Sequence, residues 1–345
     1  MRYPEFLKAG QKIGYVAPSF GCVIEPYHSL FENALKVLQE KGYQNILGPN
    51  VYENSGVGKS SSPQSCAAEV NRFFMEEDCS VILSCGGGET MCEDLPYFDF
   101  PGIARARAKW YMGYSDNTHL TFTLPTLCDT AAIYGSCAPA FGQIPWDDSI
   151  LDSYNLLTGK NLTLRNYPFF VSPEAPEAED PLAPTPYTEA DCRRQFIGKR
   201  EETGEIRVSG RLLGGCLDCL LMLLGTPYDK TDAFNQKYKE DGILWFLEAC
   251  DLNPMSIRRG LWQLRQAGWF ACAKGFLIGR PLHFAEDYMG VDRINAVLDT
   301  LGDMDLPILL DLDIGHLPPR MPLISGAFAE VLSTREQFRL THILR

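Results

Sequence analysis

Short apolar runs alternate with longer amphipathic stretches through the first part of the chain. Residues 13–17, 81–83 and 109–113 are apolar runs of strand length. Residues 27–41 and 63–78 instead repeat apolar side chains at the three- to four-residue spacing of a helix. Strands that alternate with helices in this way predict a mainly parallel sheet with helices on both of its faces.

The same alternation returns near the end of the chain and predicts a second α/β domain. Its first strands, 206–208 and 212–213, lead into an expected turn at Gly214 and Gly215. The other elements expected in this region are helices at 216–224 and 254–267 and strands at 243–247, 276–278 and 308–310.

Between these regions the pattern breaks. Residues 166–191 hold six prolines and six acidic residues but no lysine or arginine. A segment of this composition does not build a core of its own, so we expect a surface linker or lid. The predicted division is an N-terminal domain at 1–165, a linker at 166–205 and a C-terminal domain at 206–345.

Composition narrows the class of protein. The 345 residues include 31 Lys and Arg against 44 Asp and Glu, which gives a net charge of −13. Such an acidic chain lacks the basic surface that non-specific nucleic-acid binding requires. No apolar run approaches the roughly 20 residues of a membrane helix, and the charged first ten residues do not resemble a secretory signal. We expect a cytoplasmic enzyme with neither a nucleic-acid nor a membrane partner.

The twelve cysteines are expected to be reduced thiols, because the chain has no export signal. Cys216 and Cys219 have the CxxC spacing, but no second CxxC or HxxxH follows to complete a zinc site. Their apolar neighbours predict a buried helix in which both thiols pack into the core. The sequence therefore predicts no metal and no cofactor.

Ser115 follows the strand at 109–113 and precedes a helix start, where a serine hydroxyl projects from the sheet and helix amides can stabilise an oxyanion. Residues 113–115 resemble the start of the hydrolase motif G-x-S-x-G, but position 117 is Asn instead of Gly. Alternatively, Ser115 or Asp116 simply caps the helix.

Gly86, Gly87 and Gly88 follow the strand at 81–83. They fit neither the dinucleotide-binding nor the Walker pattern, so we expect amides for an oxyanion rather than a phosphate cradle. Cys85 beside them is a rival nucleophile of the kind used by glutamine amidotransferases. Those enzymes need a His and a Glu close together downstream, and the chain has no such local pair, which favours a buried inert thiol.

Five histidines are present, and His316 is the best candidate for a catalytic base because it lies in a proline-rich loop after the strand at 308–310. His283, also at a strand end, ranks second. Glu248 ends the strand at 243–247 and could orient an imidazole. The alternative for each histidine is a structural role.

Six motifs follow one another along the chain in the order seen in the L,D-carboxypeptidases. Through these motifs the chain resembles that serine peptidase family, which includes the microcin C immunity proteins. The resemblance spans about residues 11–331. The motifs are IGYVAPS at 13–19, the glycines at 86–88, GYSD at 113–116, Gly-Gly at 214–215, Leu-Glu at 247–248 and Gly-His at 315–316.

This resemblance implies the roles of individual residues. Ser115 would be the nucleophile, Glu248 and His316 would complete the triad, and the amides of Asp116 and Gly87 would form the oxyanion hole. Gly86, Gly88 and Cys216 would contact substrate. Many family members have Asn where this chain has Cys216, which leaves that side chain's contact open. The resemblance also implies a flavodoxin-like first domain, a smaller swivelling β/β/α second domain and a homodimer.

The resemblance implies hydrolysis of an amide next to a free carboxylate. The substrate would be the terminal D-alanine of a muropeptide tetrapeptide, as in peptidoglycan recycling, or an aminoacyl-nucleotide toxin, as in microcin immunity. The long proline-rich stretch resembles the immunity subgroup. Two alternatives stay open: an amidotransferase-like hydrolase that uses Cys85, and a ligand-binding protein without catalysis.

Overall fold

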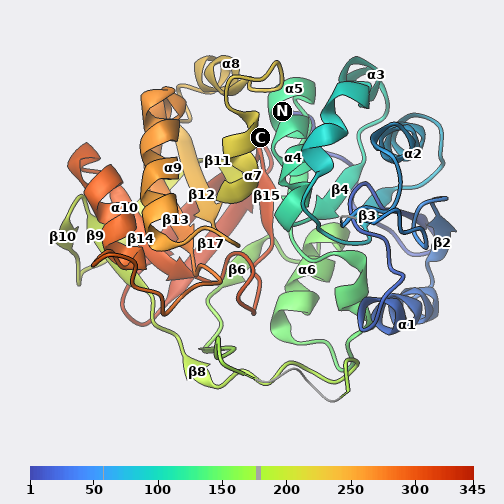
Figure 1. Ribbon diagram of the computed structural model, residues 1–345, viewed down its shortest axis with the longest axis horizontal. Helices are drawn as coiled ribbons and strands as arrows, with labels where there is room; N and C mark the ends of the chain where they lie inside the picture. Colours follow the sequence, from blue (N-terminus) through green and yellow to red (C-terminus); the bar gives the residue numbers. More distant parts are fainter. Residues whose placement is uncertain (57, 176–179) are drawn as a thin grey trace. The chain divides into compact units, whose positions relative to one another are not determined.

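The computed structural model describes residues 1–56, 58–175 and 180–345, which form two compact α/β units (Figure 1). Unit 1 comprises Met1–Asn161, residues 180–185 and Pro322–Ser325. Unit 2 comprises Leu162–Ala175, Pro186–Met321 and Gly326–Arg345. The α/β class and the two-domain organisation that the sequence predicts are confirmed. None of the described helices is long and apolar enough to span a membrane.

Unit 1 is built on a sheet in the order β15-β5-β4-β3-β1-β2. The first five strands along the chain are parallel, and β15 pairs antiparallel with β5 at one edge. The order 2-1-3-4-5 of the parallel strands is the flavodoxin-like order that we expected. The strands are β1 Lys12–Val16, β2 Gln44–Leu47, β3 Val81–Ser84, β4 Trp110–Gly113, β5 Ala132–Tyr134 and β15 Leu323–Ser325.

Helices cover both faces of this sheet, which is why β3 and β4 are buried along their whole length and appear in the sequence as continuous apolar runs. On one face α1 packs against the short helix η4, and on the other α2 packs against α3 and α3 against α5 (Figure 1). The helices are α1 Tyr27–Glu40, α2 Pro63–Met75, η1 Met91–Glu93, η2 Leu95–Tyr97, α3 Phe100–Arg105, η3 Ser115–Asn117, α4 Thr118–Thr121, α5 Thr123–Cys128, η4 Ala138–Gly142 and α6 Asp148–Thr158.

Local chemistry fixes where the longer helices of unit 1 begin and end. The Ser62 side chain caps α2 by accepting a hydrogen bond from the Ser65 amide, and Pro63 occupies the first turn. Asp147 caps α6 in the same way, and Gly159 ends that helix with a left-handed residue. Because the helices begin and end at these residues, loops lie at the carboxyl ends of the parallel strands.

Unit 2 is built on a nine-stranded sheet, within the described residues, in the order β10-β9-β14-β13-β12-β11-β16-β17-β6. Its four central strands, β14 to β11, are parallel, and antiparallel strands extend it on both sides. The strands are β6 Thr163–Arg165, β9 Arg194–Ile197, β10 Arg200–Glu201, β11 Ile206–Cys216, β12 Ile243–Glu248, β13 Ala273–Gly279, β14 Pro307–Leu312, β16 Phe328–Ser333 and β17 Phe338–Ile343.

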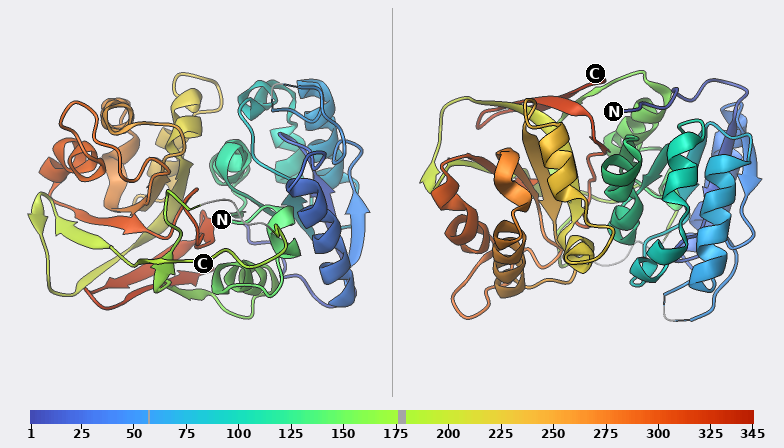
Figure 2. Two further views of the ribbon diagram at one scale, coloured as in Figure 1. Left: turned by 60° about the horizontal axis from the view of Figure 1, so that its bottom comes forward. Right: turned by 90° about the horizontal axis from the view of Figure 1, so that it is seen from above.

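The helices α9 and α10 pack against each other on one face of this sheet (Figure 2). Asn253 caps α9 by accepting from the Ser256 amide, and the helix buries Ile257, Leu261 and Leu264. The helices of unit 2 are α7 Leu217–Leu223, α8 Thr231–Lys237, α9 Pro254–Gln266, η5 Trp269–Cys272, α10 Arg293–Leu301 and η6 Gly302–Met304.

The stretch 166–205, which we expected to be a linker, contains several strands. β9 is part of the main sheet, where Phe196 is buried opposite Ile308 of β14. The short strands β7 Phe169–Phe170 and β8 Glu189–Ala190 pair with each other. Strands of two to four residues with charged side chains do not show the alternation by which a strand is recognised. Residues 176–179 of this stretch lie outside the described residues.

The turn expected at Gly214 and Gly215 is not a turn. Both residues lie inside β11, an eleven-residue strand that continues to Cys216. A Cβ atom at Gly214 would collide with the backbone carbonyl of Phe246 on the neighbouring strand β12. The glycine is therefore required because two backbones approach closely, and not because the chain reverses.

Candidate active site

Ser115 lies at the carboxyl end of β4, at the tight connection to η3 and α4. Its backbone has a φ of 64°, the left-handed conformation that costs a non-glycine residue about 1–3 kcal/mol. The Ser115 amide donates to the Tyr134 hydroxyl at 3.2 Å. A strained serine between a strand and a helix is the geometry of a hydrolase nucleophile elbow.

Asn117 occupies the position at which the motif G-x-S-x-G has its last glycine. Its Nδ2 donates to the carbonyl oxygens of Gly86 at 2.8 Å and Tyr114 at 3.0 Å. The side chain thus fastens the glycine loop to the elbow. A Cβ atom at Gly113 would lie 2.6 Å from Asn117 Cγ, so the motif's first glycine makes room for this side chain.

Gly87 lies directly against the serine. A Cβ atom added there would be 2.9 Å from Ser115 Cβ and 3.0 Å from Ser115 Oγ. Its carbonyl accepts from the Phe20 amide at 2.8 Å. Its own amide nitrogen has no acceptor among the described residues. Unit 1 therefore brings together Ser115, Asp116 and the glycine loop, as the sequence predicts.

The Asp116 carboxylate is buried and joins three segments around the elbow. It accepts from Ser19 Oγ at 2.6 Å and from the Met91 amide at 2.9 Å, and it pairs with His119 Nδ1 at 3.1 Å. Burial acts to raise its pKa, but these hydrogen bonds and the histidine hold the pKa of Asp116 below its usual range. Neither Ser19 nor His119 was predicted as a site residue. For Ser19 the sequence contains a signal, since this residue ends the motif at 13–19.

Asp94 is a second buried carboxyl near the elbow. Burial, with the negative charge of Asp116, raises the pKa of Asp94 to about 8, although Lys59 partly opposes the rise. At neutral pH the site therefore contains one carboxyl that holds its proton and one that does not.

In unit 2, Glu248 ends β12 and is register partner of Cys216 at the end of β11. The Glu248 side chain is 0% exposed, and its Oε2 lies 2.9 Å from His316 Nδ1, whose side chain is 12% exposed. With Nδ1 donating to the carboxylate, Nε2 is the nitrogen that can accept a proton. The structure thus brings together Glu248 and His316, which lie far apart in the sequence.

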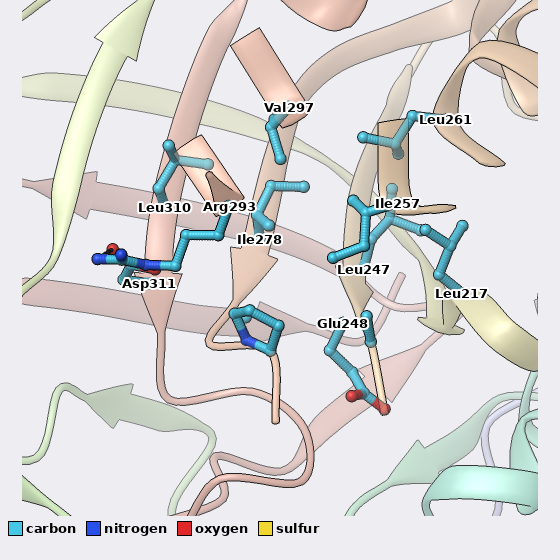
Figure 3. A pocket seen from close by; sticks show the side chains of 13 residues that line it. Leu217, Leu247, Glu248, Ile257, Leu261, Ile278, Arg293, Val297, Leu310 and Asp311 are labelled. Atoms are coloured by element: carbon cyan, nitrogen blue, oxygen red, sulfur yellow. Dashed lines mark hydrogen bonds and ion pairs between the residues drawn. The ribbon is translucent and has the colours of Figure 1, made fainter. Parts of the chain in front are cut away.

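The carboxylate of Glu248 lies at the edge of an apolar pocket between the sheet and α9 and α10. Figure 3 shows the carboxylate turned away from the aliphatic lining, while Arg293 and Asp311 form an ion pair at another edge of the pocket. A low-polarity wall behind the Glu248–His316 pair strengthens its electrostatic attraction. The larger aliphatic side chains of the lining are Leu217, Leu247, Ile257, Leu261, Ile278, Val297 and Leu310.

Two glycines fit around Glu248. Gly315 has a φ of 108°, and a Cβ atom there would lie 2.5 Å from Glu248 Oε2. A Cβ atom at Gly279 would approach Glu248 Cβ to 3.0 Å. The glycine of the Gly-His motif is therefore required both by its backbone conformation and by the carboxylate packed against it.

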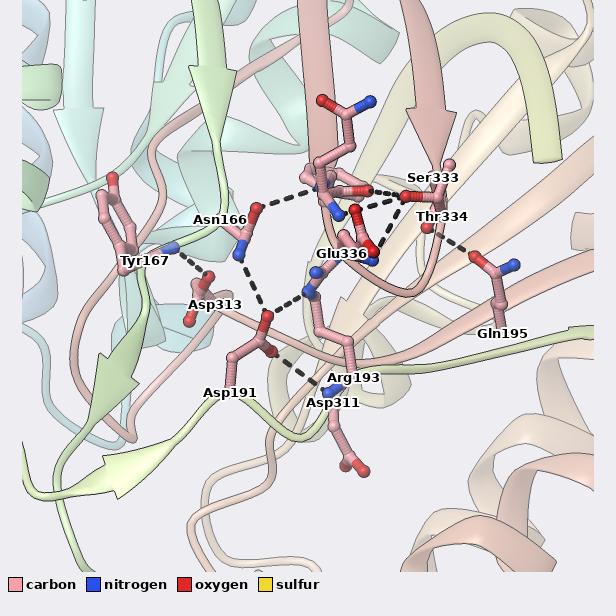
Figure 4. Close-up of polar contacts among 12 residues, drawn as sticks. Asn166, Tyr167, Asp191, Arg193, Gln195, Asp311, Asp313, Ser333, Thr334 and Glu336 are labelled. Atoms are coloured by element: carbon pink, nitrogen blue, oxygen red, sulfur yellow. Dashed lines mark hydrogen bonds and ion pairs between the residues drawn. The ribbon is translucent and has the colours of Figure 1, made fainter. Parts of the chain in front are cut away.

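The loop that carries His316 is anchored at several points. Arg320 donates from Nε to the carbonyl of Gly315 and from Nη2 to the carbonyl of His316, both at 3.1 Å. Just before the loop, Asp313 forms a buried ion pair with Arg280. It also accepts from the Tyr167 amide at 3.0 Å (Figure 4). Arg320 was not predicted, because a residue that binds backbone carbonyls leaves no motif.

Cys216 completes this half of the site. Its thiol, a carboxylate oxygen of Glu248 and a ring nitrogen of His316 all lie within 4.8 Å of one another. A hydrogen bond with Cys219, burial and the charge of Glu248 raise the pKa of the Cys216 thiol well above its ordinary value. The predicted site residues thus fall into two groups, one in each unit.

A strained serine at the end of a parallel strand and a His–Glu hydrogen bond are two features that serine hydrolases share. Residues 13–135 match the LD-carboxypeptidase N-terminal domain and residues 209–331 match the LD-carboxypeptidase C-terminal domain. Together the two matches cover more than half of the chain. The chain belongs to the LD-carboxypeptidase family of serine peptidases.

Curated relatives agree with this membership. A Vibrio cholerae protein named as a carboxypeptidase is 23% identical, over 99% of this chain and 98% of its own. A Bacillus subtilis protein named as a murein peptide carboxypeptidase is 24% identical, over 97% of this chain and 92% of its own.

Solved structures share the whole fold. The MccF-like protein of Bacillus anthracis has a TM-score of 0.81 at 21% identity and covers all of both chains. The microcin C7 self-immunity protein MccF, solved with adenosine monophosphate, has a TM-score of 0.80 at 20% identity and covers 99% of both chains. The same protein has been solved with glutamyl sulfamoyl guanosine.

Proposed function

We propose that this peptidase hydrolyses an amide next to a free carboxylate, with Ser115, Glu248 and His316 as its triad. The observation that carries the proposal is the hydrogen bond of 2.9 Å between His316 Nδ1 and Oε2 of the buried Glu248. The strained Ser115 beside Gly87 supports it from the other unit. The proposal requires that the two units bring Ser115 Oγ to His316 Nε2 during catalysis.

Each residue has one task in this reaction. His316 Nε2 takes the proton from Ser115 Oγ as the oxygen attacks the carbonyl carbon, and later gives it to the leaving amine. Glu248 holds the imidazole orientation and stabilises its positive charge. The amides of Asp116 and Gly87 stabilise the oxyanion, a task in which one lost donor typically costs about 10²–10³ in rate. Water then releases the acyl group from Ser115.

Two substrate classes contain the required amide. The murein peptide carboxypeptidase of Bacillus subtilis, by its name, supports a peptidoglycan tetrapeptide that loses its terminal D-alanine. The aminoacyl sulfamoyl nucleosides bound by MccF support an aminoacyl-nucleotide substrate. We propose the peptide as the first substrate and the aminoacyl nucleotide as the second. Gly86, Gly88 and Cys216 remain proposed substrate contacts.

The chemistry of Cys85 speaks against a cysteine mechanism. The side chain is buried, and burial together with the neighbouring Cys22 raises the pKa of the Cys85 thiol well above its ordinary value. A thiol held in its neutral form is a poor nucleophile. Iodoacetamide should therefore leave activity intact.

The test compares Ser115→Ala with Ser29→Ala, a serine on α1 whose hydroxyl donates to Glu25 at 2.9 Å, on the surface of the unit. Both variants are assayed for D-alanine release from the muropeptide tetrapeptide and for hydrolysis of an aminoacyl sulfamoyl adenosine. We expect Ser115→Ala to lose at least about 10³-fold in kcat while Ser29→Ala keeps it. Wild-type turnover by Ser115→Ala would end the proposal, and binding without turnover by the wild-type chain would make it a ligand-binding protein.

The proposal also includes a cytoplasmic location and a homodimer. A chain with twelve cysteines, all thiols in the structure, suits a reducing compartment. Light scattering coupled to gel filtration measures the mass of the assembly directly.

A further inference from the structure

Three donor groups of different chemistry meet in unit 2. Cys216 ends β11, Glu248 ends β12, and His316 lies in the loop after β14. Their thiol, carboxylate and imidazole atoms all lie within 4.8 Å of one another, with Cys216 and Glu248 buried and His316 at the more exposed edge. No sequence spacing reveals this group, because three different segments contribute to it.

Sulfur, nitrogen and carboxylate oxygen are the ligands that zinc binds in proteins. Open zinc sites use three protein ligands and leave the fourth tetrahedral position to water or substrate. Metal–ligand lengths of about 2.0–2.3 Å place neighbouring ligands about 3–4 Å apart. Because the three donor atoms already lie within 4.8 Å of one another, side-chain movements on the order of 1 Å would bring them to that geometry. The Cys216 thiol releases its proton when the cation binds, and the resulting thiolate favours zinc and other soft ions over magnesium or calcium.

We propose that Cys216, Glu248 and His316 form a binding site for a thiophilic divalent cation of the zinc class, and that this cation inhibits the enzyme. A cation held by the imidazole and by the carboxylate breaks the hydrogen bond that orients His316. The base is then unable to accept the Ser115 proton. The inhibition, though not the binding, rests on the proposed function.

Binding is tested with Co²⁺ as a spectroscopic probe on the metal-free, full-length chain. We expect one Co²⁺ per chain, a thiolate-to-cobalt charge-transfer band, and displacement by Zn²⁺. Cys216→Ala should abolish the band and weaken Zn²⁺ binding at least about tenfold, and His316→Ala should weaken it similarly. Cys272→Ser, a thiol on η5 whose Sγ donates to the Asn235 carbonyl, is the matched control and should bind as the wild type does.

Absence of the band in the wild type, or a band that persists in Cys216→Ala, would overturn the site. If the cation instead binds at the surface, Cys272→Ser and Cys216→Ala should show the same change in Zn²⁺ affinity. That result would also overturn the proposed site. Circular dichroism of each variant separates lost binding from lost folding, and His316→Ala tests the site independently should Cys216→Ala not fold.

Turnover supplies the second measurement. Zn²⁺ should lower kcat of the wild type, and EDTA should restore it. If EDTA abolishes activity and Zn²⁺ restores it, the cation is catalytic, and both the inhibition and the metal-free triad are wrong. One bound Zn²⁺ in a chain that hydrolyses neither substrate would sustain the site and contradict the proposed function. Activity that Zn²⁺ does not affect would refute the inhibition.

Discussion

The two groups of candidate site residues, one in each unit, are built by different physical means. In unit 1 the backbone positions the candidate nucleophile, since Ser115 has a strained conformation and the backbone of Gly87 lies against its side chain. In unit 2 a contact between two side chains positions the candidate base, since Glu248 is fully buried and hydrogen-bonded to His316. We therefore expect catalysis to be lost when an atom is added beside Ser115 in unit 1, and when either member of the Glu248–His316 pair is removed in unit 2.

Unit 2 also contains a second His–Glu pair with which Glu248 and His316 can be compared. His283 and Glu286 form another His–Glu pair, at 3.5 Å, but their side chains are 45% and 34% exposed. Exposed pairs contribute little because water and salt screen them, whereas a buried carboxylate that loses its partner is costly. The same two residue types therefore have different consequences in the two places.

The largest effect is expected from replacing the histidine that is bonded to the buried Glu248. His316→Ala removes the proposed base and should lower kcat at least about 10³-fold, while His283→Ala should change it less than about twofold. Steady-state kinetics on both variants measures this. Equal losses in the two variants would show that burial does not distinguish the pairs.

The next effect is that of the carboxylates. Glu248→Gln keeps the shape of the side chain but removes the charge that stabilises the imidazolium, so kcat should fall about 10²-fold or more. Glu286→Gln is the matched change in the exposed pair and should leave kcat and melting temperature unchanged. Retained activity in Glu248→Gln would remove Glu248 from the proposed triad.

A smaller effect is expected when an atom is added to unit 1. Gly87→Ala places a methyl group 2.9–3.0 Å from the Ser115 side chain, which must then rotate or shift. We expect kcat to fall about 10- to 100-fold with little change in melting temperature. Gly204→Ala is the control because its added Cβ approaches only the end of the flexible Glu202 side chain, which is 29% exposed. An unchanged kcat would mean that the serine has room to move.

The smallest effect concerns the pH dependence of stability. The pKa of Asp94 is about 8 in the folded chain, above about 4 in an unfolded one. The folded chain thus binds the proton more tightly, and the free energy of unfolding falls as pH rises from about 4 to about 8. Glu69, buried with a pKa of about 7, acts in the same direction.

Asp94→Asn should flatten this decline by about 1 kcal/mol or more between pH 6 and 9, because it lacks the titrating proton. Urea unfolding at the two pH values measures the difference. Asp78→Asn, whose side chain is 84% exposed in the wild type, should keep the wild-type slope. A slope in Asp94→Asn equal to that of the wild type would place the titration elsewhere.

Elements with a continuous apolar run or a clear helical period were predictable from the sequence. The buried strands β3 and β12 and the amphipathic helices α1 and α9 appear close to their expected bounds. β9 was not predicted, because its burial is supplied by β14, far along the chain. Gly214 and Gly215 were taken for a turn, because a glycine required by a neighbouring strand looks the same in sequence as one required by a bend.

The candidate site follows a similar division. Residues at strand ends could be selected from the sequence, and Ser115, Glu248 and His316 were chosen in this way. The residues that position these side chains could not be identified from the sequence. His119 bonds to the Asp116 carboxylate and Arg320 to backbone carbonyls, and only the folded chain brings these partners together. The role of Cys216 beside Glu248 likewise depends on the register of β11 and β12.

The edge strand β15 has a consequence for synthesis. Leu323 of β15 pairs with Tyr134 of β5, so more than half of the chain must leave the ribosome between the two partners. Until then a nascent unit 1 presents the unpaired backbone of β5, an edge open to pairing with other chains. Completion of the first sheet therefore awaits nearly the last part of the polypeptide. A fragment that ends before residue 323 lacks this protecting strand.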